Sequence, residues 1–124
     1  MRDFRKYEVW KDSVVLANEV YSVCESFPKF ETFALGDQMR RAAVSIASNI
    51  AEGSSRSSSV EFAHFLEISM GSAYETETQL EIAKLRGYIS DATSDELFSR
   101  LWSIEKRLNA LISKLRTENN KNGR

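Results

Sequence analysis

The sequence contains few of the residues that interrupt helices or build common reactive sites. Its 124 residues include one proline, one cysteine, one histidine and five glycines. Because Cys24 has no second cysteine to pair with, an internal disulfide and a cysteine-rich zinc site are excluded, and a reducing compartment is indicated. The scarcity of proline and glycine predicts long regular elements joined by short turns.

Long apolar runs are also missing, and so is a strong net charge. No apolar segment approaches the roughly 18 residues that a membrane span needs, and the charged N-terminus lacks the apolar core of a signal peptide. We therefore expect a cytoplasmic protein with no membrane partner. The formal net charge is only −1, so any attraction to nucleic acid has to come from local patches.

Apolar residues instead recur at steps of three and four in four stretches, which is typical of amphipathic helices. The first stripe is Trp10, Val14, Ala17, Tyr21 and Cys24, widened by Leu16, Val20, Val23 and Phe27. The next two are Leu35, Met39, Ala43, Ile46 and Ile50, then Phe62, Leu66, Ser69, Ala73, Leu80 and Ala83. The fourth is the heptad series Leu97, Leu101, Ile104, Leu108, Leu111 and Leu115.

Start and stop signals place these helices at about 7–27, 35–53, 59–86 and 94–117. Pro28 should end the first, a serine-rich turn after Gly53 the second, and Gly87 the third. The segment Thr93–Glu96 reads as a capping box for the fourth helix. The polar tail 118–124 is expected to be disordered.

Four long helices with short connections predict an all-α fold, an antiparallel up-down-up-down four-helix bundle in one domain over residues 1–124. The apolar surfaces of the first and fourth helices are wider than one bundle core requires. Such width indicates either a broad core stripe or a subunit interface, and we expect a homo-oligomer.

The second predicted helix carries a polar stripe beside its apolar one. Its members are Gln38, Arg41, Ser45, Asn49, Glu52 and Arg56, and folding the hairpin brings Arg41 opposite Ser72 and Glu75 of the third helix. We predict a partly buried ion pair between Arg41 and Glu75, bridged by Ser72, because a guanidinium removed from water needs a carboxylate partner. The alternative is that Arg40, Arg41 and Arg56 contact phosphate.

Two segments of the sequence resemble those of a known protein family. The run QMRRAAVSIASNIAEGSSRSS, followed by EFAHFLEISMGSAYETETQLEIAKLRGYI, resembles the four-helix-bundle proteins encoded in bacterial 23S rRNA intervening sequences. The segment EVWKDSVVLANEVYSVCESFP is similar to their first helix, so the likeness covers roughly residues 7–90. It implies a homopentamer without an established activity. A related family, the accessory variability determinant proteins of diversity-generating retroelements, implies a link to nucleic acid and reverse transcriptase.

The resemblance also implies a set of signature positions, none of them an established catalyst. They are Gln38, Arg41, Ser45, Asn49, Glu52, Gly53, Arg56, Gly71, Ser72, Glu75 and Glu77. Met70 departs from the pattern, since relatives usually carry a basic residue there, and Arg86 intrudes into a leucine-glycine-tyrosine motif. The missing positive charge at Met70 weakens the nucleic-acid expectation.

Little in the sequence favours catalysis. Glu61 and His64 form one Glu-x-x-His pair, but a di-iron centre in a bundle needs two such pairs and further glutamates. A single histidine also leaves no Ser-His-Asp arrangement, and no glycine-rich phosphate loop is present. We therefore expect no metal, no cofactor and no enzymatic activity.

Charge is distributed unevenly between the last two helices. Residues 93–124 contain seven Lys/Arg against four Asp/Glu, whereas residues 57–92 contain two against six. Our leading hypothesis is a non-catalytic ring that binds RNA or DNA weakly, without sequence preference, through a basic surface. The candidate contacts are Arg40, Arg56, Lys106, Arg107, Lys114 and Arg116. The alternative is an adaptor or structural oligomer that binds another protein and no nucleic acid.

Overall fold

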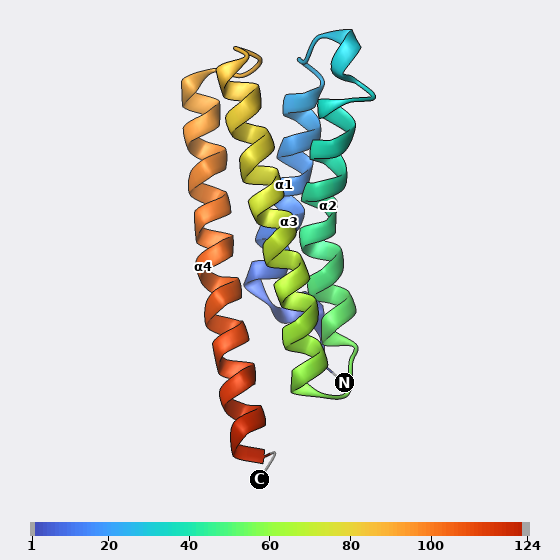
Figure 1. The fold of residues 1–124 in the computed structure, drawn as a ribbon, viewed down its shortest axis with the longest axis vertical. Coiled ribbons are helices and arrows are strands. Elements are labelled where there is room, and N and C mark those ends of the chain that lie inside the picture. Colours follow the sequence, from blue (N-terminus) through green and yellow to red (C-terminus); the bar gives the residue numbers. More distant parts are fainter. Residues whose placement is uncertain (1, 123–124) are drawn as a thin grey trace.

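The computed structural model describes residues 2–122 as four long helices and two short 3-10 helices (Figure 1). The long helices are α1 (Glu8–Cys24), α2 (Leu35–Ser54), α3 (Ser59–Leu85) and α4 (Asp91–Asn122). The short ones are η1 (Phe4–Lys6) before α1 and η2 (Lys29–Glu31) in the α1–α2 connection.

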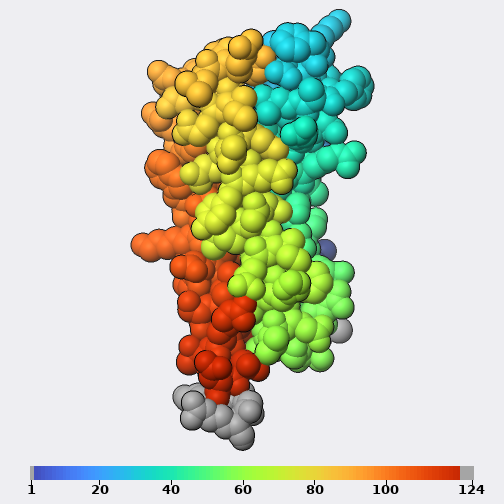
Figure 2. Space-filling view, viewed as in Figure 1, coloured from blue at the N-terminus to red at the C-terminus, as the bar shows by residue number. Residues whose placement is uncertain are grey.

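Successive helices run in opposite directions and pack side by side, and α4 also packs on α1, which closes the bundle (Figure 1). This confirms the all-α, up-down-up-down four-helix architecture. Figure 2 shows α3 crossing the front of the molecule between α4 and α2. The C-terminal end of α4 continues past the turn that joins α2 to α3 (Figure 1).

The core is formed from one face of each helix. Its fully buried side chains include Leu16 of α1, Ile46 of α2, Phe62 and Leu66 of α3, and Leu101 of α4. Burying one such side chain stabilises the fold by about 1.5–3 kcal/mol. The predicted stripes of α2, α3 and α4 supply most of this core.

For α1 the predicted centre of the apolar stripe is wrong. Val14 is 42% exposed and Tyr21 is 48% exposed, although both were expected in the core. The core positions are instead Val9, Leu16, Val20, Cys24 and Phe27, most of which were expected only to widen the stripe. Because α1 is apolar over a wide arc, periodicity alone does not decide which edge faces inward.

The turns between helices follow the expected chemistry with small shifts. The Ser58 hydroxyl caps α3 by accepting the Glu61 backbone N–H at 3.1 Å. Gly87 has a φ of +75°, and the backbone N–H groups of Gly87 and Tyr88 close the end of α3 by donating to the carbonyls of Lys84 and Ala83. The left-handed backbone conformation at this position favours glycine, because it is energetically unfavourable for residues that have a Cβ atom.

The start of α4 is a correction. The helix begins at Asp91, and its cap is Ser90, whose hydroxyl accepts the Thr93 backbone N–H at 3.2 Å. Thr93 was expected to be that cap. Ser90 precedes the helix by one residue and offers the same hydroxyl acceptor three residues before Thr93, so it adds one more turn of helix.

The end of α4 is a second correction. The tail was expected to be disordered from residue 118, but the helix continues to Asn122. No proline or glycine occurs between Gly87 and Gly123, so no strong breaker ends the backbone hydrogen bonding earlier. Residues 123 and 124 of the expected tail lie outside the described part of the chain. Within that part, none of the helices combines the length and apolarity that crossing a bilayer requires.

Candidate functional site

The centre of the predicted polar stripe joins α2 to α3. The Asn49 amide nitrogen donates to the Ser45 hydroxyl and to the Ser45 carbonyl, both at 2.9 Å. The Ser72 hydroxyl donates to the Ser45 hydroxyl at 2.8 Å, and beside it the buried Ser69 hydroxyl donates to the Ile46 carbonyl, also at 2.8 Å. Ser72 was expected opposite Arg41, but it meets Ser45 instead.

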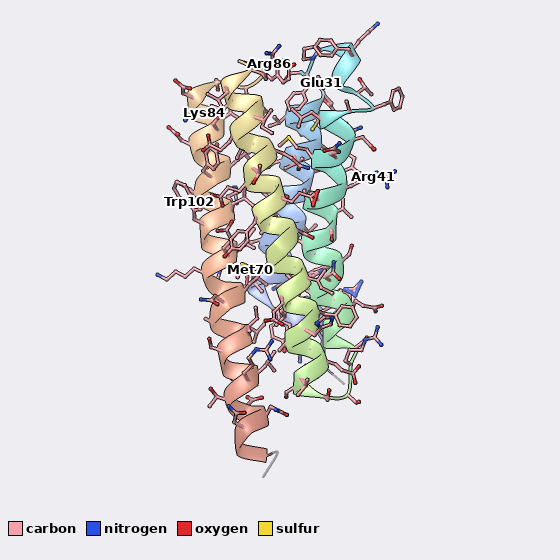
Figure 3. All side chains as sticks on the ribbon, in the orientation of Figure 1. Glu31, Arg41, Met70, Lys84, Arg86 and Trp102 are labelled. Atoms are coloured by element: carbon pink, nitrogen blue, oxygen red, sulfur yellow. The ribbon has the colours of Figure 1, made fainter. Side chains whose placement is uncertain are left out.

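Arg41 does not form the ion pair that the sequence suggested. Its side chain is 79% exposed, lies on the outer edge of α2 and donates to Asp37 at 3.0 Å (Figure 3). Glu75 instead accepts from Gln79 at 3.4 Å. Asp37 lies one helical turn before Arg41, so this local pair forms without the cost of removing two charges from water.

The rest of the stripe consists of separate local contacts. Glu52 pairs with Arg56 one turn later at 3.2 Å. Gln38 is exposed, and its side chain makes no hydrogen bond within the part of the chain that the structure describes. The seven residues predicted as one structural network are thus a central hydrogen-bonded group flanked by surface pairs.

Two of the candidate phosphate-binding arginines support local structure. Arg40 donates to the Thr32 carbonyl at 2.8 Å and lies over the Tyr21 ring. Arg56 lies 4.6 Å from the centre of the Phe65 ring while it pairs with Glu52. Both guanidinium groups are therefore occupied by neighbours in the same chain.

The basic residues of α4 fall into two classes. Arg107 pairs with Asp12 of α1 at 2.7 Å, and Arg116 pairs with Glu67 of α3 at 2.5 Å. Lys106 and Lys114 are exposed, and no ion pair involves either one among residues 2–120. The positive charge predicted on α4 is thus partly neutralised by acidic partners, and the two lysines are the most available of the six candidates.

A long apolar groove runs along the outer side of α1 and α2. It has a volume of about 400 Å³ and contains one polar side chain, Ser48. Its lining residues are Phe4, Trp10, Val14, Ala17, Val44, Ala47, Ser48 and Ala51. We call this surface the α1–α2 groove. Two further hollows adjoin it, one beside Arg40 and Arg41 and one beside Glu52 and Phe65, and Ser48 lines both.

Two carboxylates meet on the other side of the bundle, where α3 packs on α4. Glu77 of α3 accepts a hydrogen bond from the Trp102 indole nitrogen at 3.2 Å. Burial, followed by a hydrogen bond and the charge of Glu77, raises the pKa of Glu105 to about 8. Figure 3 shows Trp102 on α4 near this seam.

Cys24 and His64 lie in unrelated settings. The Cys24 thiol is buried against the Gly36 carbonyl, and burial raises its pKa despite the opposing effect of Arg40. His64 is exposed beside Phe65. Among the described residues, no three His, Cys, Asp or Glu side chains are grouped in a way that would bind a metal.

Comparison with known proteins places this arrangement in a family. The family model described as 23S rRNA-intervening sequence protein matches residues 5–110. The chain belongs to this family. The match extends the likeness seen in the sequence, which covered roughly residues 7–90, into most of α4.

A solved structure gives the same fold. It is described as a protein with unknown function from the S23 ribosomal protein family of Bacteroides thetaiotaomicron. The two chains share 26% sequence identity with a TM-score of 0.78, and the alignment covers 84% of this chain and 97% of that one. Among curated protein sequences, none matches this chain.

The two glycines among the signature positions that the resemblance implied, Gly53 and Gly71, differ in their surroundings. A Cβ atom on Gly53 would lie 2.6 Å from the Phe65 Cβ and 2.9 Å from the Phe62 ring, so glycine is required where α2 and α3 approach each other. A Cβ atom on Gly71 would meet nothing within 4 Å. Packing within one subunit therefore explains why residue 53 is a glycine, but it does not explain the glycine at position 71.

The structure also places Met70 and Arg86, the two residues expected to depart from the pattern that the resemblance implied. Met70 is half-buried and packs against the core, and Figure 3 shows it near the middle of α3. Arg86 is exposed after the end of α3, and its guanidinium lies 6.0 Å from the centre of the Tyr88 ring. Neither residue extends a basic surface along α4.

Two features escaped sequence reasoning. The first is the contact between Glu105 and Glu77. Glu105 directly follows Ile104 of the α4 apolar stripe, so it lies at the edge of the α3–α4 interface, and the antiparallel register of the two helices could have predicted that it lies near Glu77. The second is the α1–α2 groove. The sequence predicted that the apolar stripe of α1 is wider than the core requires, but it did not show which edge of that stripe is exposed.

Proposed function

We propose that this protein is a non-catalytic subunit of a homo-oligomeric ring, and that the α1–α2 groove binds a second copy of the chain. The observation that carries the proposal is the groove itself. Val14 and Val44, on adjacent helices, are 42% and 40% exposed and face the same apolar channel. Monomers seldom leave an apolar channel of this kind open to water.

The shape of the groove suits a helix as its occupant. Small residues, Ala47, Ser48 and Ala51, lie along α2 and would let another helix approach closely. Phe4 and Trp10 form an edge-to-face pair with ring centres 4.9 Å apart, which supplies a rigid aromatic wall. Buried aromatic anchors of this kind commonly dominate the free energy of an interface.

The outer face of α3 offers a matching surface. Its exposed stripe contains Val60, His64, Ile68 and Gly71 at steps of three and four, and Ile82 eleven residues farther along the same face; we call it the α3 outer stripe. Gly71 would allow the backbone of α3 to sit close to the small residues of the groove, which gives that glycine a purpose. Groove and stripe are different surfaces, so each copy would bind the next head to tail.

Head-to-tail contacts close into a ring when the rotation between copies permits it. Membership of the 23S rRNA-intervening sequence protein family, together with the resemblance described above, suggests five copies. No step of a chemical reaction is assigned to the ring, because none of the described clusters provides a nucleophile with a base.

Two neighbouring valines provide a matched test. Val14 lines the groove, whereas Val15 is 43% exposed on the same helix but outside it. We expect Val14→Glu to be a folded monomer by size-exclusion chromatography with light scattering, and Val15→Glu to keep the wild-type mass. Equal masses for the two variants would contradict the assignment of the groove.

Mixing two defective variants tests the head-to-tail arrangement. Ile68→Glu should damage the α3 outer stripe and leave the groove intact, while Val14→Glu does the reverse. Each variant alone should be monomeric, and an equal mixture should give a dimer joined by the one remaining pair of intact surfaces. A mixture that stays monomeric would show that the groove does not bind the stripe.

A second candidate function is weak binding of RNA or DNA, and the free lysines of α4 favour it. Lys106 and Lys114 are exposed two turns apart, and a ring would repeat them in every subunit. Repetition raises avidity strongly even when each contact is weak. Phosphate contacts of this kind are insensitive to sequence and weaken as salt rises.

Filter binding to single- and double-stranded RNA and DNA across a salt series tests this candidate. The variant Lys106→Gln/Lys114→Gln should bind less tightly and with a shallower salt dependence. The control, Lys6→Gln/Lys29→Gln, removes two exposed lysines elsewhere and should bind like the wild type. Absence of binding at low salt would leave the alternative, a structural or adaptor oligomer that contacts only protein.

A further inference from the structure

The carboxylates of Glu77 and Glu105 lie between α3 and α4 in an arrangement that simple packing does not explain. One oxygen of each group, Glu77 Oε1 and Glu105 Oε2, is shielded from solvent and receives no hydrogen bond from an N–H or O–H donor of the described residues. The second oxygen of Glu77 accepts from the Trp102 indole at 3.2 Å. Shielded acceptors without donors destabilise a fold, so this pair requires an explanation.

Nearby cationic side chains do not neutralise the two carboxylates. Arg100 and Arg107 of α4 turn away to Glu19 and Asp12 of α1, and Arg116 pairs with Glu67 farther along α3. Lys84 of α3 lies over the Phe98 ring. Glu77 is thus the charged group that acts on Glu105, and its charge has the same sign.

A single proton would account for both the missing hydrogen-bond donor and the close approach of two like charges. A protonated carboxyl group has one O–H donor, so a proton on Glu105 would let it donate to Glu77 and remove the repulsion between two negative charges. We propose that Glu77 and Glu105 share one proton at neutral pH and that this shared proton fastens α3 to α4, so that its loss loosens the seam. This proton-binding site does not rest on the proposed assembly, because neither Glu77 nor Glu105 belongs to the α1–α2 groove or to the α3 outer stripe.

The direction of the pH dependence follows from where the proton is bound. Burial first, and then Glu77, raises the pKa of Glu105 in the folded protein to about 8, whereas the ordinary value is 4.5. Between these two values the folded state binds more protons than the unfolded state, so stability falls as pH rises. The contribution is complete below the ordinary pKa and is lost as pH rises through about 8.

Trp102 provides a direct probe of the seam. The chain has two tryptophans, so the Trp10→Phe variant leaves Trp102 as the only indole. We expect its fluorescence to show one transition with a midpoint near pH 8, because the indole donates to Glu77. Adding Glu105→Gln should abolish the transition, since an amide donates to Glu77 at every pH. Persistence of the transition in that double variant would overturn the proposal.

Stability measurements provide an independent readout. Urea unfolding of the wild type should show a lower free energy of unfolding at about pH 9 than at about pH 6. Glu105→Gln and Glu77→Gln should each remove most of this difference. Glu81→Gln, an exposed glutamate one turn from Glu77 on α3, should retain it. A wild-type slope in Glu105→Gln, or loss of the slope in Glu81→Gln, would show that the pair does not carry the proton.

Discussion

The two helical glycines Gly53 and Gly71 should respond in opposite ways to the same substitution. In Gly53→Ala the new methyl would lie 2.6 Å from the Phe65 Cβ and 3.2 Å from the Phe62 carbonyl oxygen. Phe62 is completely buried, so α2 and α3 would have to separate. Overpacking of this kind costs about 1–3 kcal/mol, which exceeds the gain of up to about 1 kcal/mol from the better helix former.

Gly71→Ala has no such cost, because no atom lies within 4 Å of the added methyl. Only the helix propensity changes, so we expect stabilisation by about 0.5–1 kcal/mol. The measurement is urea unfolding followed by circular dichroism, in the Val14→Glu background so that assembly does not contribute. The reasoning is refuted if Gly53→Ala is as stable as its parent, or if Gly71→Ala is clearly less stable.

Three further predictions concern capping, a buried hydroxyl and the thiol. Ser90→Ala should lower the free energy of unfolding by about 1 kcal/mol, because the N-terminal cap of α4 is lost, and Thr93→Ala should lower it by much less. Urea unfolding measures both values, and a larger loss in Thr93→Ala would show that Thr93 is the cap. Ser69→Ala should cost about 1 kcal/mol, because the Ile46 carbonyl loses its donor from α3, and an unchanged unfolding midpoint would show that this bond adds nothing. Cys24 should react slowly with a thiol reagent in the folded protein at neutral pH, because burial raises its pKa, and reaction as fast as in urea would contradict this burial.

The sequence predicted the core faces of α2, α3 and α4. On α4 the apolar surface is also wide, but the regular heptad series marked its centre, and the flanking Phe98 and Ile112 are buried beside that series while Trp102 stays exposed. On α1 the apolar arc is wide enough to include both Leu16, which is buried, and Val14, which is exposed. Periodicity identifies such an arc without revealing its centre, and the part left outside the core became the groove.

The polar contact predicted from the sequence, Arg41 with Glu75, is wrong, and the contact that α2 and α3 do make, between Ser45 and Ser72, was not predicted. Ser45 and Ser72 have short side chains, so the helix register alone brings their hydroxyls together. Arg41 has a long flexible side chain and an acidic neighbour, Asp37, one turn away on its own helix. A surface pair within one helix forms without desolvation, and sequence spacing toward Glu75 does not reveal that competition.

Sedimentation equilibrium of the wild-type chain over a dilution series tests the central claim most directly. One chain has a mass of 14.1 kDa. If the α1–α2 groove binds a second copy head to tail, one species with an integer multiple of that mass should dominate, five-fold for the expected ring. A single species of 14.1 kDa at every concentration would contradict the account.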